Sequence, residues 1–556
     1  MANINDSCNV LIVDQKIYDH TSVEKKWLKR WEQIGLSKGI IDSNKKAYSI
    51  VLPPPNITGM LTMGHVLNSI IQDLLIRWKK MCGFSTCWFP GLDHAGIATE
   101  NKVRNSIPKN NTIKKNTLLN EIQKWADKHQ SIILKQLKNL GCICDWSKQR
   151  FTLDESYKRA VLEAFIFLYK KHYIYRKEWI VNWCPKLQTA LSDEEVIYRE
   201  VDEKLYYFYY PIKNKKNNFI EIATTRPETI FGDVAIAVNC CDERYTKLIG
   251  EKIILPLVNR EITVISDSSV DIHFGTGCVK VTPAHDKNDF NIGIRHSLKI
   301  INTMNVDGTM CKNKLPKIFR GLDRLECRQL VVSEMQKLGL VAKIEDYKHK
   351  VGYSERGNVP IEFRVSKQWF IKMKDLAKPA IEAVKLGKIK FYPEYWYKVY
   401  FNWMNNIQDW CISRQISWGH RIPVWYKRHT NEKIIHVGIN IPPEDKNKTE
   451  NKDSNNNTTW IKGKDVLDTW FSSWIWPFAV MGWPNQNEEW RYFYPTNDLV
   501  TAPDIIFFWV ARMIMSSLKY NDIIPFKNVY FTGVVRDMTG KKLSTFQSIQ
   551  SSEDFR

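Results

Sequence analysis

The sequence predicts an α/β protein in which a parallel sheet flanked by helices is split by a β-rich insert. Across residues 47–185, apolar runs of strand length alternate with helical runs, which is typical of a parallel sheet covered by helices. Residues 192–342 change to short β-rich pieces, and the alternating pattern returns after residue 353. A chain of 556 residues is too long for a single hydrophobic core. We therefore expect several cores and a sheet that resumes after the insert.

The N-terminal segment, residues 1–46, is expected to be helical. Residues 21–24 read Thr-Ser-Val-Glu, a capping-box signal, and Val23, Trp27, Trp31 and Ile34 recur at helical spacing. We expect this helix to pack its tryptophans on something larger, as part of a core.

The first half of the α/β unit covers residues 47–190, and its second half covers residues 346–556. An apolar strand at 48–52, an amphipathic helix at 66–78 and a helix at 117–140 are predicted in the first half. In the second half, the pattern resumes in residues 403–425, 499–515 and 529–535. Residues 444–458 are polar and low in complexity, so they are expected to be an exposed loop or disordered.

The insert is assigned to residues 191–345. Its predicted strands are residues 205–210, 219–223, 234–238, 252–258 and 278–281. Short strands at this density favour a compact β-rich unit.

The chain carries a net charge of +21, spread along its length. A dispersed positive charge favours a polyanionic partner such as nucleic acid. The alternative is lysine-rich drift, because Lys, Asn and Ile crowd the predicted loops.

The cysteines give no disulfide framework, since the twelve residues contain no C-x-x-C pair and no secretory leader precedes them. A reducing cytoplasm is therefore expected. Cys184 could begin a zinc knuckle, but Leu187 stands where the second ligand would be, so zinc is not expected. No apolar run is a convincing membrane span.

Residues 53–65 connect the strand at 48–52 to the helix at 66–78 and read Pro-Pro-Pro-Asn-Ile-Thr-Gly-Met-Leu-Thr-Met-Gly-His. Gly64 and His65 fall where the first unpaired N–H groups and the positive end of the helix dipole would face a triphosphate. The segment therefore predicts nucleotide binding.

Several motifs, in matching order, resemble the valyl branch of the class I aminoacyl-tRNA synthetases. They are the 53–65 segment, which ends like the His-Ile-Gly-His motif, and residues 91–99, 409–415, 418–423 and 465–473. The resemblance covers nearly the whole chain. It implies a Rossmann-like parallel-sheet catalytic domain that is split by a β-barrel-like editing insert.

The resemblance implies activation of valine by ATP and transfer of the product to tRNA(Val), without a covalent catalyst. ATP would arrive with Mg²⁺. Gly64 would let the phosphates approach, His65 would donate to them, and Lys542 would bring a cation to the leaving pyrophosphate. Thr62 and Ser544 belong to the same two ATP-binding motifs.

For the amino acid, the resemblance places Asp93 and Asn56 at the ammonium group and lets Pro54, Trp470 and Ile505 form a small apolar pocket. Taken singly, Trp470 is more typical of a core aromatic residue, and Asp93 could be a helix cap. Their joint occurrence in the family order is what favours the functional assignment.

Editing is implied because threonine is nearly isosteric with valine, and valyl-tRNA synthetases are the known case in which binding separates the two by only about 10². Residues 223–229 and 274–289 look like the editing signatures of this family, and they contain Thr224, Thr225, Arg226, Phe274, Lys280, Thr282, Asp286 and Asp289. By resemblance, Asp289 would hold the threonyl ammonium and Asp286 and Thr282 would read the hydroxyl. Arg226 and Lys280 would hold the terminal adenosine. Read alone, His285-Asp286 predicts a satisfied β-turn.

Three positions depart from the family pattern. Thr62 replaces the first histidine of the His-Ile-Gly-His motif, and Ala502 adds a methyl group beside the pocket. The Lys-Met-Ser-Lys-Ser loop loses its second lysine, because Thr545 follows Ser544, and the chain stops at Arg556. We expect a C-terminally truncated or frameshifted product that lacks the helical anticodon-binding domain and the coiled coil.

Two function classes remain open at this point, and a third is weaker. The chain is either a valine–tRNA ligase, which a separate anticodon-binding polypeptide could serve, or a remnant that only binds tRNA acceptor ends or edits. A non-enzymatic basic RNA-binding module is the third interpretation.

Overall fold

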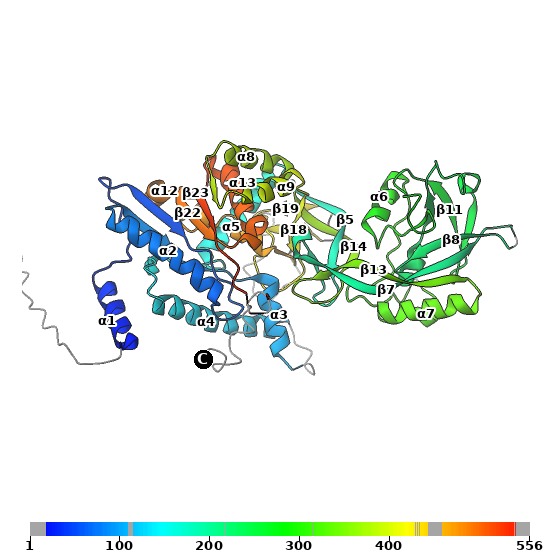
Figure 1. Ribbon diagram of the computed structural model, residues 1–556, viewed down its shortest axis with the longest axis horizontal. Helices are drawn as coiled ribbons and strands as arrows, with labels where there is room; N and C mark the ends of the chain where they lie inside the picture. Colours follow the sequence, from blue (N-terminus) through cyan, green and yellow to red (C-terminus); the bar gives the residue numbers. More distant parts are fainter. Residues whose placement is uncertain are drawn as a thin grey trace, which may run out of the picture.

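The computed structural model describes residues 18–108, 115–215, 217–313, 315–428, 430, 432, 434–442, 459–536, 538 and 540. Lys542, Ser544 and the polar segment 444–458 lie outside these residues. Figure 1 shows an elongated molecule with the parallel sheet and its helices in one part and the insert in the other.

A five-stranded parallel sheet forms the centre of the first part, in the order β15-β23-β22-β1-β2. Its strands are β1 (Ala47–Val51), β2 (Ser85–Phe89), β15 (Lys390–Tyr392), β22 (Thr496–Thr501) and β23 (Phe526–Phe531). Strands β1 and β2 precede the insert and the other three follow it. The expected resumption of the sheet is therefore confirmed.

Helices cover both faces of this sheet, so strands β1, β2 and β22 are buried along nearly their whole length. The helices are α2 (Met63–Met81), α4 (Lys115–Asn139), α5 (Glu155–Lys170), α8 (Lys374–Lys385), α9 (Trp396–Asn405) and α13 (Ala511–Asn521). Val51 packs in one core with Phe165 of α5, whereas its neighbour Ile50 packs in another with Ile76 of α2 and Ile122 of α4. This alternation along β1 follows from the two-residue period of a strand.

From β1 the chain passes through α2 to β2, toward one edge of the sheet. From β22 it passes through α13 to β23, toward the opposite edge. Strands β1 and β22 are neighbours, so the direction of winding reverses between them. In open parallel sheets, the crevice outside the carboxyl ends of two such strands is where ligands bind.

A second, antiparallel sheet links this domain to the insert in the order β16-β14-β5-β6. Its strands are β5 (Ile174–Cys184), β6 (Thr189–Leu191), β14 (Glu362–Ile371) and β16 (Trp410–Cys411). Strand β5 leads toward the insert and β14 returns from it, and the two pair along their length.

The insert consists of two sheets around one core. They are β13-β7-β8 and β10-β11-β9-β12, formed by β7 (Val196–Pro211), β8 (Phe219–Thr224), β9 (Ala235–Val238), β10 (Lys252–Leu255), β11 (Arg260–Ser266), β12 (Cys278–Val281) and β13 (Val341–Ser354). Phe208 and Ile222 of the first sheet share a core with Ile236 and Ile253 of the second. Helices α6 (Lys287–Arg295) and α7 (Arg324–Lys337) flank it (Figure 1).

Smaller elements complete the catalytic part. They are α3 (Gly96–Ser106), α10 (Thr469–Ser473), α11 (Trp476–Ala479), α12 (Glu488–Phe493), the pair β3 (Gly91–Leu92) and β4 (Arg150–Phe151), the pair β17 (Ser413–Arg414) and β21 (Val466–Leu467), and the sheet β18 (Val424–Lys427), β19 (Ile435–Val437) and β20 (Trp460–Lys462). No helix in the described ranges combines the length and apolar character of a membrane span.

The N-terminal helix α1 (His20–Gln33) forms, but two details of its prediction are wrong. Asp19, not a residue of the Thr-Ser-Val-Glu run, accepts hydrogen bonds from the first backbone N–H groups. No residue of α1 is buried, and Trp27 is 47% exposed. Trp31 lies under the guanidinium of Arg77, 4.5 Å from its ring centre. The helix is therefore held at the surface by stacking rather than by a core.

Candidate active site

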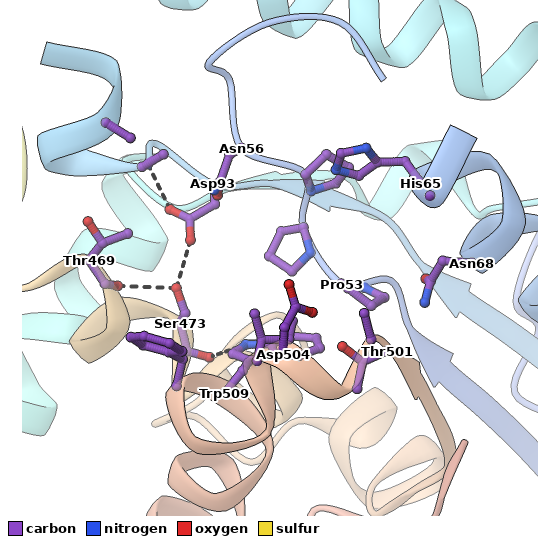
Figure 2. A pocket seen from close by; sticks show the side chains of 18 of the residues that line it. Pro53, Asn56, His65, Asn68, Asp93, Thr469, Ser473, Thr501, Asp504 and Trp509 are labelled. Atoms are coloured by element: carbon purple, nitrogen blue, oxygen red, sulfur yellow. Dashed lines mark hydrogen bonds between the residues drawn. The ribbon is translucent and has the colours of Figure 1, made fainter. Parts of the chain in front are cut away.

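A cavity of about 380 Å³ lies at the carboxyl ends of β1, β22 and β23, where the winding of the sheet reverses. All predicted catalytic-domain residues that the structure describes line it: Pro54, Asn56, Thr62, Gly64, His65, Asp93, Trp470 and Ile505. Figure 2 shows Asn56 and Asp93 on one side of this cavity and His65 and Asn68 on the other. Residues more than 400 positions apart in the sequence thus form one site.

Helix α2 begins at Met63 with Thr62 as its N-cap residue, so Gly64 and His65 lie in its first turn as predicted. The Thr62 backbone N–H donates to Nδ1 of His65 at 3.0 Å, and Thr62 Oγ1 lies 2.8 Å from the same nitrogen. Because a backbone N–H can only donate, Nδ1 is the acceptor and the neutral ring carries its proton on Nε2. A Cβ added at Gly64 would meet only Thr62 Oγ1, at 3.7 Å, so the helix start is open to a close-lying ligand.

Asp93 is buried beside the Asn56 backbone, which forms a bridge with it. Its Oδ1 accepts from the Ala95 N–H at 3.0 Å and its Oδ2 from Ser473 Oγ at 2.7 Å, while His94 Nδ1 lies 3.2 Å from Oδ1. Burial alone would raise the pKa of the Asp93 carboxyl, but the bonds from His94, Ala95 and Ser473 outweigh burial and lower it. The site therefore contains a buried, ionised carboxylate.

The walls next to Asp93 are apolar. Trp470 and Phe508 pack with their ring centres 5.0 Å apart, and Ile505 also lines the cavity. Trp509 also lines the cavity, and its Nε1 donates to the Ser473 carbonyl at 3.1 Å. Trp509 and Ser473 were not predicted as site residues from the sequence. Trp509 lies four residues after Ile505, a spacing that could have placed it on the same helical face.

The insert brings its two predicted segments together through buried hydrogen bonds. Lys280 Nζ donates to Thr229, Asp233 and Thr282 at 2.7, 3.0 and 2.7 Å. The Thr282 N–H donates to Oδ2 of Asp289 at 2.8 Å. The segment from β8 and the segment after β12 therefore share one polar cluster.

The cations of this cluster are already engaged. All three donors of Lys280 have partners, and the three nitrogens of Arg226 donate to Glu228, the His285 carbonyl and Glu362. Thr224 accepts from the Arg226 N–H at 3.0 Å, Thr225 is half-buried, and Phe274 is 57% exposed. In this arrangement, the two cations shape the cluster rather than extend toward a ligand.

Two aspartates of the insert differ in role. Asp286 accepts from the Asn288 and Asp289 N–H groups and so caps helix α6. Asp289 is 7% exposed, and burial, reinforced by the Asp286 charge, raises the pKa of its carboxyl to about 7. Perturbed carboxyls of this kind are typical of functional sites.

A second cleft, of about 1000 Å³, lies between the linking sheet, α6 and α13. Aromatic rings line it in stacked pairs, Tyr175 with Phe370 and Trp403 with Phe507. Lys177, whose ammonium lies 3.5 Å from the centre of the Trp179 ring, adds positive charge.

Among the described residues, no group of three or more His, Cys, Asp or Glu side chains is placed so that it could hold a metal ion. Cys184 is buried and reduced.

This chain belongs to the class I tRNA synthetases. The family model described as "tRNA synthetases class I (I, L, M and V)" matches residues 26–552. The likeness to the valyl branch is confirmed by relatives: the chain is 49% identical to the valine–tRNA ligase of Clostridium tetani over 545 residues, which cover 97% of this chain and 60% of that protein. It is 48% identical to the corresponding enzyme of Carboxydothermus hydrogenoformans, over 95% of this chain and 59% of that one.

The chain thus spans about 60% of the length of these relatives. Among solved structures, the LeuRS–tRNA–LeuAMS complex of Agrobacterium radiobacter K84 is similar with a TM-score of 0.51 and 17% identity, covering 95% of this chain and 69% of that chain. This likeness shows the Rossmann-like class I fold.

Proposed function

We propose that this chain activates valine with ATP and transfers it to tRNA(Val), and that its insert hydrolyses threonyl-tRNA(Val). The observation that carries the proposal is a single cavity with an open helix start at Gly64 and His65 and a buried, ionised carboxylate at Asp93. A phosphate and an ammonium group can therefore be held in one place.

The nucleotide lies at the start of α2. The unpaired N–H groups and the helix dipole favour the phosphates there, and Nε2 of His65 donates to them. Mg²⁺ accompanies ATP as part of the substrate. Lys542 and Ser544, which lie outside the described residues, are assigned to the leaving pyrophosphate.

The amino acid lies next to Asp93 and Asn56. The carboxylate pairs with the ammonium group, and Pro54, Trp470, Ile505 and Trp509 surround an aliphatic side chain. With both substrates held, the valine carboxylate attacks the α-phosphate in line and pyrophosphate leaves. Positioning and charge stabilisation supply the rate, so no protein nucleophile is needed.

Editing is assigned to the cluster around Asp289. Once ionised, this carboxylate pairs with the ammonium of a misattached threonine, and Thr282 lies beside it to meet the side-chain hydroxyl. A site built to hydrogen-bond a hydroxyl rejects its methyl analogue strongly. Asp286 contributes by capping the helix that positions Asp289.

The acceptor end of tRNA is assigned to the second cleft. Aromatic faces next to lysines are the arrangement that binds single-stranded nucleic acid, and the net charge of +21 favours the polyanion. A separate polypeptide that binds the anticodon is a possible further partner, and the cytoplasm is the predicted location.

A second candidate function is supported by Thr62. Threonine takes the position of the first motif histidine and leaves one imidazole at the phosphates instead of two. In this alternative, the chain edits or binds acceptor ends but does not ligate.

Valine-dependent exchange of pyrophosphate into ATP distinguishes the two functions. We expect weak but valine-specific exchange. Thr545 stands where the signature loop would carry its second lysine, and one missing charged contact in the transition state can cost about 10² in rate. Exchange that is independent of valine, or absent while threonyl-tRNA hydrolysis persists, would favour the second candidate.

A further inference from the structure

Arg414 lies behind the amino-acid wall of the cavity and does not line it. Its side chain is 1% exposed, and Nη1 donates to the carbonyls of Cys411 and Ser413 at 2.8 and 3.1 Å. Nη2 donates to Oε2 of Glu195 at 2.8 Å and to Oδ2 of Asp468. One guanidinium thus bridges two carboxylates.

Asp468 is the N-cap of α10. Its Oδ1 accepts from the Trp470 N–H at 2.9 Å, while its Oδ2 faces Arg414. The same short helix carries Trp470, a wall of the cavity, and Ser473, which donates to Asp93. The position of Asp468 therefore sets the position of both residues.

Glu195 stands where the chain enters the insert, and its carbonyl accepts from the N–H of Glu355, where the chain returns. Glu195 and Glu355 both line the cavity. The Ser192 N–H also donates to Glu195 Oε2 at 2.8 Å, so both Ser192 and Arg414 hold this carboxylate. The base of the insert is thereby joined through Arg414 to the helix that holds Asp93.

We propose that Arg414 is a positioning residue for the amino-acid site: it ties the base of the insert, at Glu195, to Asp468 and so fixes α10 with Trp470 and Ser473. This inference rests on the proposed function in taking the bound amino acid to lie at Asp93.

The chemistry requires arginine at this position. The two carboxylates would repel each other without a shared cation, and a planar guanidinium can hold both while also reaching two carbonyls. A lysine keeps the charge but offers a single point donor. Removing the cation altogether leaves two buried carboxylates unpaired, which is strongly destabilising.

The test therefore uses conservative variants. Arg414→Lys and Glu195→Gln are compared with the unaltered chain by calorimetric titration with a nonhydrolysable valyl-adenylate analogue and, separately, with ATP. Both variants should bind the analogue at least about tenfold more weakly, because the bridged contact is lost, with ATP affinity within about twofold. Arg324→Lys is the matched control, since Arg324 is also buried and paired, with Glu362 at 3.0 Å, but lies away from the cavity; it should bind like the parent.

Hydrogen exchange of the 468–474 peptide gives a readout that needs no ligand. Loosening Asp468 should speed exchange of the Trp470 amide in Arg414→Lys but not in Arg324→Lys. Equal weakening of analogue and ATP, unchanged analogue binding, or unchanged exchange at 468–474 would each overturn the proposal. If the parent chain binds no analogue, the proposed function fails, and the exchange measurement still decides the role of Arg414.

Discussion

Asp93 and Asp289 are both buried carboxyls, one in the catalytic cavity and one in the insert, yet their surroundings shift their pKa values in opposite directions. At Asp93, burial is outweighed by the interaction with His94 and by hydrogen bonds from Ala95 and Ser473, so its pKa is lowered. At Asp289, burial and the Asp286 charge outweigh the one backbone bond, from Thr282, and raise its pKa to about 7. Burial alone does not decide ionisation; the donors and charges around the group do.

The difference has a functional consequence under the proposed reaction. With a lowered pKa, Asp93 is ionised at neutral pH and can pair there with the ammonium group of the amino acid. Asp289 is close to its titration midpoint and becomes fully charged only when an ammonium group arrives or the pH rises.

The largest expected effect separates the two sites. Asp289→Ala should abolish hydrolysis of threonyl-tRNA(Val) while valine-dependent pyrophosphate exchange stays unchanged, because the insert residue does not line the catalytic cavity. Deacylation of preformed threonyl-tRNA measures the first activity. Unaltered hydrolysis in this variant would remove Asp289 from the editing site.

The converse variant acts on the other site. Asp93→Asn should lower valine-dependent exchange by about 10²–10³, since a neutral amide cannot replace a buried charge partner. Hydrolysis of threonyl-tRNA should be retained, which serves as the internal control for folding. Loss of both activities would show that Asp93 supports the structure rather than valine.

The pH dependence should distinguish the carboxyls directly. With a pKa raised to about 7, Asp289 is neutral below pH 7 and charged above it, so hydrolysis should rise severalfold between pH 6 and pH 8. The lowered pKa of Asp93 predicts no such rise in amino-acid binding over the same range. A flat profile for hydrolysis would contradict the assigned state of Asp289.

The mildest substitution tests one donor of Asp93. Ser473→Ala removes one hydrogen bond to a charged group, which is worth about 1.5–3 kcal/mol, and should raise the KM for valine about tenfold. The KM for ATP should change little. Ser516→Ala, at another buried serine bonded only to backbone carbonyls, is the control.

Motifs predicted the parallel sheet, the helix start at Gly64 and the residues of the cavity, because each signal is local. The charge state of Asp93 could not be predicted in this way, since its partner Ser473 lies 380 residues further along the chain. The partners of Arg226 and Lys280 could not be predicted for the same reason: Asp233 and Glu362, which engage them, come from other elements. Strand β13 was missed because its exposed, polar residues pair with β7 without a core face.

In the proposed reaction, one cavity holds a phosphate at the start of α2 and an ammonium group at Asp93. A crystal structure of the chain with a nonhydrolysable valyl-adenylate analogue would reveal both contacts. We expect the amine within hydrogen-bonding distance of the Asp93 carboxylate and the phosphate mimic beside Gly64 and His65. An analogue bound elsewhere, or one whose amine does not contact Asp93, would contradict it.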